Sequence, residues 1–321
     1  MMANIQAVAR LAGTSRSTVS RVISGNPHVS PAAKAKVLAA IKQLGYVPNS
    51  LARQMRAQKS HTIGLLTAGY FPTLGDFLNE FAQSAQQYGY HVNVYVTRNA
   101  EEERAVLANL ETHLLDAVYL MTQFNDWPVI EQYAQFGPIA TWRRLDSPVI
   151  YSSYVDHYPV YLQILTYLAA KHFTRIGHVL SAPSSTNTKA RLRAIQTFAN
   201  AHPRIDQSWQ VFSPVQAGAG IKAAQQWLAD AQRPPAVIIY SDYVAADFIA
   251  TLRQAGKTVP QDCQVFGFDN SAFGRVMGLT TIDPKLGQQA QNAFHYLYNQ
   301  LHKQQLPIMP ITPTIVRRES C

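Results

Sequence analysis

The 321-residue chain has little cysteine and little charge, and it lacks a long apolar run. Cys263 and Cys321 are its only cysteines, so neither a disulfide scaffold nor a cysteine-based metal site is expected. Charged residues make up 15% and hydrophobic residues 47%, a composition typical of folded globular proteins rather than disordered ones. No apolar leader or run of about 20 apolar residues is visible, so we expect a soluble protein of a reducing cytoplasm without membrane association.

Acidic residues are absent from the first 75 positions. Residues 1–60 contain nine Lys/Arg, and the first acid is Asp76. The remaining chain holds 19 Lys/Arg and 19 Asp/Glu, so the formal net charge of +9 belongs to the N-terminal segment. A small basic module favours a polyanionic partner such as DNA, because binding phosphates releases counterions. A solvated tail and a membrane-surface helix are the alternatives.

The basic segment has the pattern of three short helices. Apolar residues spaced for one helix face predict a helix near residues 5–12, which Gly13 ends. Ser15 is placed to cap a second helix with Arg16, Ser17 and Arg21 on its outer face. Ser30 and Pro31 open a third helix that ends at Gly45. Its predicted inward side chains are Val37, Leu38, Ile41 and Leu44. The pattern predicts a helix-turn-helix domain whose second helix enters the DNA major groove.

Three runs in this segment resemble the lactose-repressor (LacI/GalR) family of bacterial transcription regulators. They are residues 8–15 (VARLAGTS), 18–23 (TVSRVI) and 44–49 (LGYVPN). The resemblance implies that Arg16 and Ser17 discriminate between operators and that Arg21 contacts a base. An arginine guanidinium can form two hydrogen bonds to the edge of a guanine. Ser15 and Thr18 are expected to bind phosphates, although packing of its methyl group is the alternative role of Thr18.

Residues 49–57 read as a very short helix, which is too short to be stable alone in water. Asn49 or Ser50 is placed at its cap. The family resemblance implies a hinge helix that forms on the operator and enters the minor groove. Met55 then occupies the wedge position, where leucine is usual, and Arg53 and Arg56 face phosphates. An ordinary interdomain linker is the alternative.

From residue 62 onward, short apolar runs alternate with helical patterns, which predicts an α/β fold with parallel sheets. The expected strands are 63–66, 92–96, 117–121, 139–142, 176–180, 211–212, 237–240 and 265–268. Two such halves indicate two lobes, with a ligand at the carboxyl ends of the strands. The predicted fold class is therefore an N-terminal three-helix helix-turn-helix domain followed by a two-lobed parallel-sheet domain.

The resemblance continues through the body and implies a fold similar to periplasmic sugar-binding proteins. We expect a DNA-binding domain at 1–48, a hinge helix and linker at 49–60, and an effector-binding and dimerisation domain at 61–321. One lobe should comprise about 61–156 plus 284–302, and the other 157–283 plus 303–321. Position by position, Arg191 and Asp269 match ligand-binding residues, with a surface charge and a loop cap as their alternative roles. Asp156 and Asp242 are weaker candidates, because capping the next helix explains both.

Three departures from the family pattern concern the effector. Arg143 and Arg144 stand where the family often has Asp-Arg, and Thr73 and Leu74 replace the usual aromatic pair, with Tyr70 and Phe71 just upstream. A family aromatic after the sixth strand aligns with Val215. Arg143 and Arg191 in one cleft would favour an anionic effector such as a sugar phosphate or a carboxylate, although a neutral sugar is the first expectation. Alternatively, Arg143 pairs with an acid. Tyr70 and Arg143 complete the predicted effector site.

The expected function is an effector-responsive repressor that binds a pseudo-palindromic operator as a homodimer. A regulator that responds to a partner protein or an anionic corepressor is the alternative. Residues 218–223 imitate a dinucleotide-binding GxGxxA fingerprint, but they lie too deep in the chain for the first βα unit. No catalytic motif, metal-ligand cluster or cofactor is expected. The sequence leaves open the identity of the effector, whether the effector weakens or strengthens operator binding, and whether the protein is a dimer or a tetramer.

Overall fold

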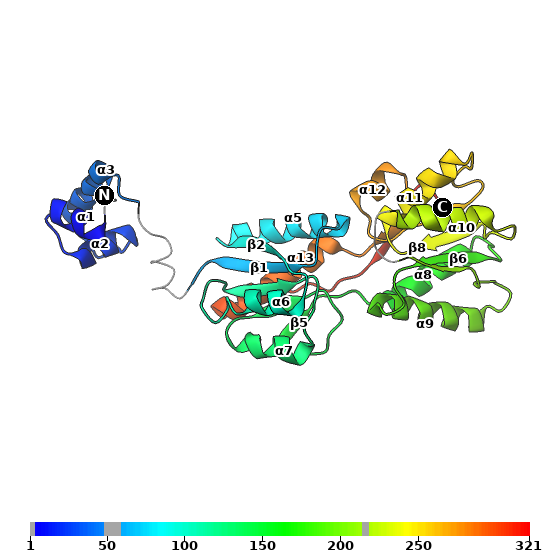
Figure 1. Cartoon of the computed structure of the whole chain (residues 1–321), viewed down its shortest axis with the longest axis horizontal. Coiled ribbons are helices and arrows are strands. Elements are labelled where there is room, and N and C mark those ends of the chain that lie inside the picture. Colours follow the sequence, from blue (N-terminus) through cyan, green and yellow to red (C-terminus); the bar gives the residue numbers. More distant parts are fainter. Residues whose placement is uncertain (1–3, 48–58, 214–217) are drawn as a thin grey trace. The chain divides into compact units, whose positions relative to one another are not determined.

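The protein, seen as a computed structural model, divides into two units, Met1–Ser60 and His61–Cys321 (Figure 1). The structure describes residues 4–47, 59–213 and 218–321. Each unit has its own hydrophobic core. The predicted fold class, a helical N-terminal domain followed by two parallel-sheet α/β lobes, is confirmed. Among the described residues, no helix is long and apolar enough to cross a membrane.

The small unit contains helices α1 (Ile5–Leu11), α2 (Arg16–Ile23) and α3 (Pro31–Leu44). The predicted caps are present: the Ser15 hydroxyl accepts a hydrogen bond from the Thr18 amide at 3.1 Å, and Ser30 accepts one from Ala33 at 3.3 Å. Gly45 ends α3 in the left-handed conformation, with a φ of 58°. One inward prediction was wrong, because Leu38 is 50% exposed and the smaller Ala40 fills the core position instead.

The first lobe of the large unit contains a five-stranded parallel sheet in the order β2-β1-β3-β4-β5. The strands are β1 (Thr62–Thr67), β2 (His91–Val96), β3 (Ala117–Leu120), β4 (Ile139–Thr141) and β5 (Ile150–Ser152). Its helices are α5 (Pro72–Gln87), α6 (Ala100–Leu107), α7 (Trp127–Glu131), the 3₁₀ turn η1 (Gln132–Gln135) and α13 (Leu286–His302). Two apolar clusters pack against this lobe's strands, as expected when helices cover a parallel sheet.

The second lobe contains a four-stranded parallel sheet in the order β7-β6-β8-β9. The strands are β6 (Ile176–Leu180), β7 (Gln210–Phe212), β8 (Ala236–Ile239) and β9 (Gln264–Phe266). Its helices are α8 (His157–Ala169), α9 (Thr186–Ala201), α10 (Ala219–Ala229), α11 (Asp242–Gln254) and α12 (Ala272–Val276). A further antiparallel pair joins β10 (Thr281–Asp283) to β11 (Thr314–Val316).

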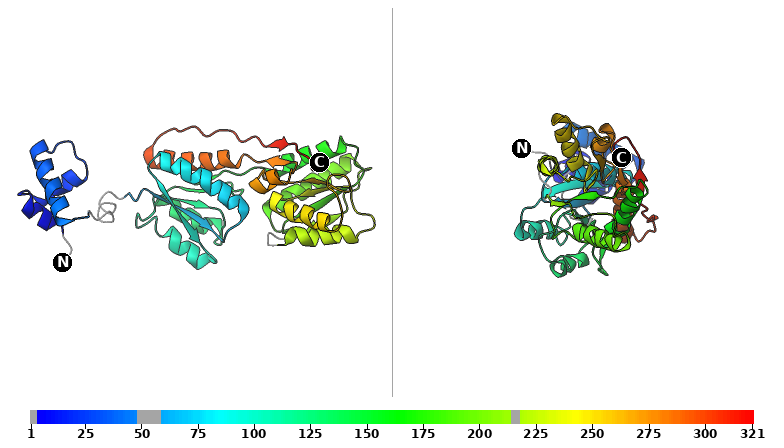
Figure 2. Two further views of the ribbon diagram at one scale, coloured as in Figure 1. Left: turned by 90° about the horizontal axis from the view of Figure 1, so that it is seen from above. Right: turned by 90° about the vertical axis from the view of Figure 1, so that its right-hand side faces the viewer.

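The segment after α13 departs from the predicted lobe boundaries. Residues 303–321 were assigned to the second lobe, but residues 306–310 run back along α13 of the first lobe before β11 begins (Figure 2). We call residues 306–310 the strap, and side chains of α13 hold its backbone. The Asn292 side chain accepts a hydrogen bond from the Met309 amide at 2.9 Å and donates one to the Met309 carbonyl at 2.7 Å. Asn299 bonds Leu306 in the same way. An extended segment that pairs with no neighbouring strand needs such side chains to satisfy its backbone groups.

Candidate functional site

Helix α2 presents its polar side chains to solvent on one face. Arg16, Ser17 and Arg21 are exposed, while Val19 and Val22 are buried against α1 and α3. Ser15 is also exposed, and its hydroxyl lies 2.7 Å from that of Ser17 and 2.9 Å from that of half-buried Thr18. The arrangement leaves both arginine forks available for a partner. Asn49, Arg53, Met55 and Arg56 lie outside the described residues, as does Val215.

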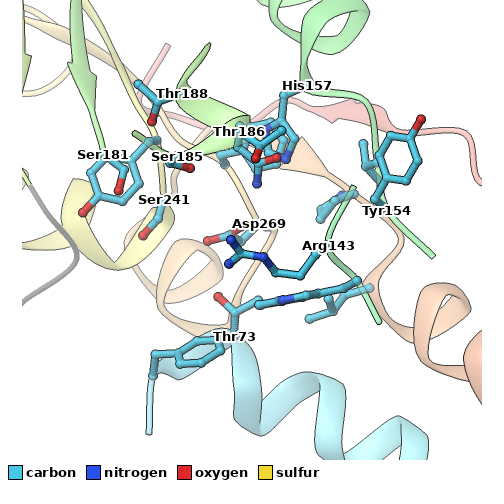
Figure 3. Close-up of a pocket in the computed structure, with 18 of the residues that line it drawn as sticks. Thr73, Arg143, Tyr154, His157, Ser181, Ser185, Thr186, Thr188, Ser241 and Asp269 are labelled. Carbon is cyan, nitrogen blue, oxygen red and sulfur yellow. The ribbon is translucent and has the colours of Figure 1, made fainter. Parts of the chain in front are cut away.

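A cavity of about 390 Å³ lies between the two lobes of the large unit (Figure 3). Its walls come from segments that follow strands of both sheets, including Thr122 after β3, Arg143 after β4, Ser181 after β6 and Asp269 after β9. In open parallel sheets, ligands bind at this carboxyl edge. The topology therefore forms a cavity at the strand ends, and the described residues that line it belong to the large unit.

Arg191 and Asp269 both line the cavity, as the resemblance implied. Arg191 is 4% exposed; it donates a hydrogen bond to the Tyr240 carbonyl at 3.1 Å and its guanidinium lies 4.8 Å from the Phe268 ring centre. Burial raises the pKa of the Asp269 carboxyl well above its ordinary value, and the charge of Asp242 adds to this, while Arg191 opposes it. The interior therefore favours an uncharged, hydrogen-bonding Asp269 more than water does.

The loop that carries Asp269 is fixed by several contacts. Asp269 has a φ of 126°, a sparsely populated conformation for a residue with a side chain. Its amide donates to the Ile282 carbonyl at 3.0 Å. Arg318 donates to the side chain of the next residue, Asn270, at 2.6 Å and to the Leu279 carbonyl at 2.7 Å. The surrounding structure thus holds a strained backbone at the cavity wall.

Arg143 and Arg144 take different roles. Arg143 lines the cavity, and Figure 3 shows it extending toward Asp269. Arg144 also borders the cavity, but it forms an ion pair with Asp156 at 3.6 Å and lies over the Tyr154 ring. Asp156, the acid beside the two arginines, therefore pairs with Arg144 and not with Arg143. Within the described parts of the chain, Arg143 forms no ion pair.

The other three predicted effector residues do not line the cavity. Tyr70 is 80% exposed, and its neighbour Phe71 provides the aromatic wall by stacking on Trp142 with ring centres 5.6 Å apart. Asp156 caps α8 by accepting a hydrogen bond from the Tyr158 amide at 3.0 Å. Asp242 begins α11 and is fully buried; its carboxylate accepts from the Thr281 hydroxyl at 2.6 Å and the Ser271 amide at 2.8 Å. The two carboxylates serve the fold.

The sequence analysis missed several cavity residues, including Thr122, His157, Thr188 and Tyr240. Among the described residues, five cavity-lining side chains have a buried polar atom without a hydrogen-bond partner. These atoms are Thr122 Oγ1, His157 Nδ1, Thr188 Oγ1, Arg191 Nε and Tyr240 Oη. Burial, with a contribution from the Arg191 charge, lowers the pKa of His157 well below its ordinary value, so the ring is neutral.

A metal site is not indicated within the chain segments that the structure describes, where no three His, Cys, Asp or Glu side chains gather as ligands. The cavity wall carries the polar and aromatic groups of a site for a polar ligand. It combines hydroxyl, imidazole and guanidinium groups with the aromatic rings of Phe71, Trp142 and Phe268.

Comparison with known proteins gives matches over both units. A family model described as "Bacterial regulatory proteins, lacI family" matches residues 4–49, and a "Periplasmic binding protein-like domain" matches residues 165–321. The ribose operon repressor of Escherichia coli (strain K12) is 32% identical, covering 97% of this chain and 98% of that protein. The HTH-type transcriptional repressor PurR of Photobacterium profundum is 28% identical, with 99% and 98% covered.

Among solved structures, the lac repressor dimer bound to operator and an anti-inducer is similar in fold. Its TM-score is 0.85 at 22% identity, and the match covers 100% of this chain and 99% of that one.

Proposed function

The chain belongs to the lacI family of bacterial regulatory proteins and is an effector-responsive, DNA-binding transcriptional repressor; from this premise we propose that it binds a pseudo-palindromic operator as a homodimer and senses a sugar, neutral or phosphorylated, in the cavity between its lobes. The effector changes operator affinity only if it binds the DNA-competent and DNA-free conformations unequally.

The observation that carries the sugar proposal is the set of unpartnered polar atoms around the cavity. A buried polar group without a hydrogen bond costs about 1–3 kcal/mol, so five of them on one cavity favour a ligand rich in hydroxyl groups. Arg191 and Asp269 supply the donor and acceptor forks that sugar hydroxyls need. Phe71, Trp142 and Phe268 supply apolar ring faces for the carbon skeleton.

The DNA proposal assigns base contacts to the exposed face of α2. Arg16, Ser17 and Arg21 read base edges in the major groove, with the two arginines suited to guanine. Ser15 and Thr18 bind phosphates and fix the position of α2. From the segment outside the described residues, we propose that Asn49, Arg53 and Arg56 contact the backbone of the operator and that Met55 enters the minor groove.

The dimer proposal draws support from large apolar side chains that the large unit leaves exposed. Val94 and Val96 on β2 are 44% and 54% exposed, and Ile221 on α10 and Val276 on α12 are 43% and 88% exposed. Exposed apolar side chains on both lobes suit a contact with a second copy. We expect Val276→Glu to weaken self-association, as measured by sedimentation equilibrium; an unchanged dissociation constant would remove Val276 from the proposed interface.

The decisive experiment selects an operator from a random pool of duplex DNA with the full-length protein. The affinity should fall steeply with salt, because phosphate contacts release counterions. Arg21→Ala should relax the preference at one base position, whereas Lys59→Ala should weaken binding to all sequences alike. A protein that binds no duplex at low salt, with or without sugars, would refute the proposed function.

A further inference from the structure

The charges that face the cavity do not balance. Arg143, Arg191 and Asp269 line it, and Arg144 is neutralised by Asp156. One positive charge is therefore in excess on the cavity walls. Asp76 influences the pKa of Asp269 from a distance, but it is exposed and does not line the cavity, so water screens its charge.

The raised pKa of Asp269 makes the excess larger. Burial and the neighbouring charge of Asp242 disfavour its ionised form, so it offsets the two arginines less than an exposed aspartate would. Arg143 is exposed, so with a neutral sugar bound only water would screen this positive charge. An anionic group on the effector would balance it.

The first turn of α9 supplies uncharged donors on the same cavity. Ser185, Thr186, Asn187 and Thr188 all line it, and Figure 3 shows Ser185, Thr186 and Thr188 on the second-lobe wall. The helix has 16 residues, its N-cap Ser185 makes no side-chain cap bond, and its first turn contains no acid. Backbone amides at such a helix start attract anions.

Thr188 gives an independent indication that a ligand belongs here. Its side chain is completely buried and lines the cavity, yet its hydroxyl has no hydrogen-bond partner in the described residues. Arg191, one turn further along α9, is also buried and has an unpartnered Nε. The start of α9 therefore offers buried donors that the protein itself does not use.

We propose that the effector is a sugar carrying an anionic group, a phosphate ester or a carboxylate, and that Arg143 together with the first turn of α9 binds this group. The inference rests on the proposed function only in taking the cavity as the effector site. It narrows the effector to a charged class, and it gives the arginine at position 143 a direct role in recognition.

The first test measures inorganic phosphate binding to the full-length protein by calorimetry, against chloride at equal ionic strength. Arg143→Gln should weaken phosphate affinity about tenfold, the effect of losing one charge-assisted contact. The matched control Lys189→Gln removes an exposed cation of α9 that does not line the cavity, and it should change affinity less than about twofold. Binding to the basic small unit contributes equally to all three proteins. Equal phosphate binding by wild type and Arg143→Gln, including no binding by either, would overturn the proposal.

The second test separates the two anion sources and the two proposals. Glucose is compared with glucose 6-phosphate and with glucuronate, by calorimetry and by the change in operator affinity. Tighter binding of either anionic sugar, lost in Arg143→Gln, supports the inference and identifies phosphate or carboxylate as the group. If glucose binds as tightly as both anionic sugars and alters operator affinity, the inference is wrong while the proposed function stands. Absence of operator binding would refute the proposed function alone.

Discussion

A buried histidine should make the large unit sensitive to mild acid. His178 lies on β6 and is completely buried, and its Nδ1 is 2.9 Å from the Tyr161 hydroxyl. Burial lowers its pKa from 6.5 to about 3. A lowered histidine pKa contributes stability above pH 6.5 that is lost as the pH falls toward 3, because the unfolded chain takes up a proton that the folded chain does not. At pH 5.0 the loss is about 2 kcal/mol, from about 1.36 kcal/mol for each pH unit below 6.5.

The assay is urea unfolding of the full-length protein at pH 7.5 and pH 5.0. All four tryptophans lie beyond residue 61, so their fluorescence reports on the large unit. His178→Gln removes the titrating group, and it should lose about 2 kcal/mol less than wild type between the two pH values. His202→Gln, an exposed histidine of the same lobe, should match wild type. Equal losses for wild type and His178→Gln would refute the reasoning, because other acid-sensitive groups, including His157, are common to both proteins.

Two further predictions concern stability. Asn292→Ala leaves both backbone groups of Met309 without their partner, and the free energy of unfolding by tryptophan fluorescence should fall by about 1–3 kcal/mol. Gln291→Ala on the same helix is the control, and a loss no larger than the control's would contradict the role of the strap. Ser15→Ala removes the cap of α2 and should cost the small unit about 1 kcal/mol, seen in its circular-dichroism melting. An unchanged melting temperature would show that the cap contributes nothing there.

Local patterns in the sequence were enough to predict most of the described helices and strands, although the short strand β5 was not expected. Ser15, Ser30 and Gly45 act within one helical turn, so their capping roles follow from neighbouring residues alone. Leu38 shows the limit of such patterns. A 3.6-residue period cannot say which of two nearby positions faces a core only three short helices wide, and the core accepted Ala40 instead.

The cavity was only partly predictable, because its residues come from segments far apart in the chain. Arg191 and Asp269 could be found by resemblance, and both line the cavity. Thr188 and His157 carry no recognisable motif, since a threonine in a helix and a histidine at a helix start are common. Their importance depends on the missing hydrogen-bond partners, which only three-dimensional packing reveals. The Arg144 ion pair likewise required knowing that Asp156 lies beside it.

The order in which the two lobes can be completed during synthesis follows from the path of the last 40 residues. The first lobe is finished by α13 and by residues 306–310 along it, and the second by β11 and Ser320, whose hydroxyl donates to the Val265 carbonyl. A ribosome therefore releases the helical N-terminal unit long before either lobe can close. Until then the apolar faces of two sheets lack their final cover, so the nascent chain exposes apolar surface during much of its synthesis.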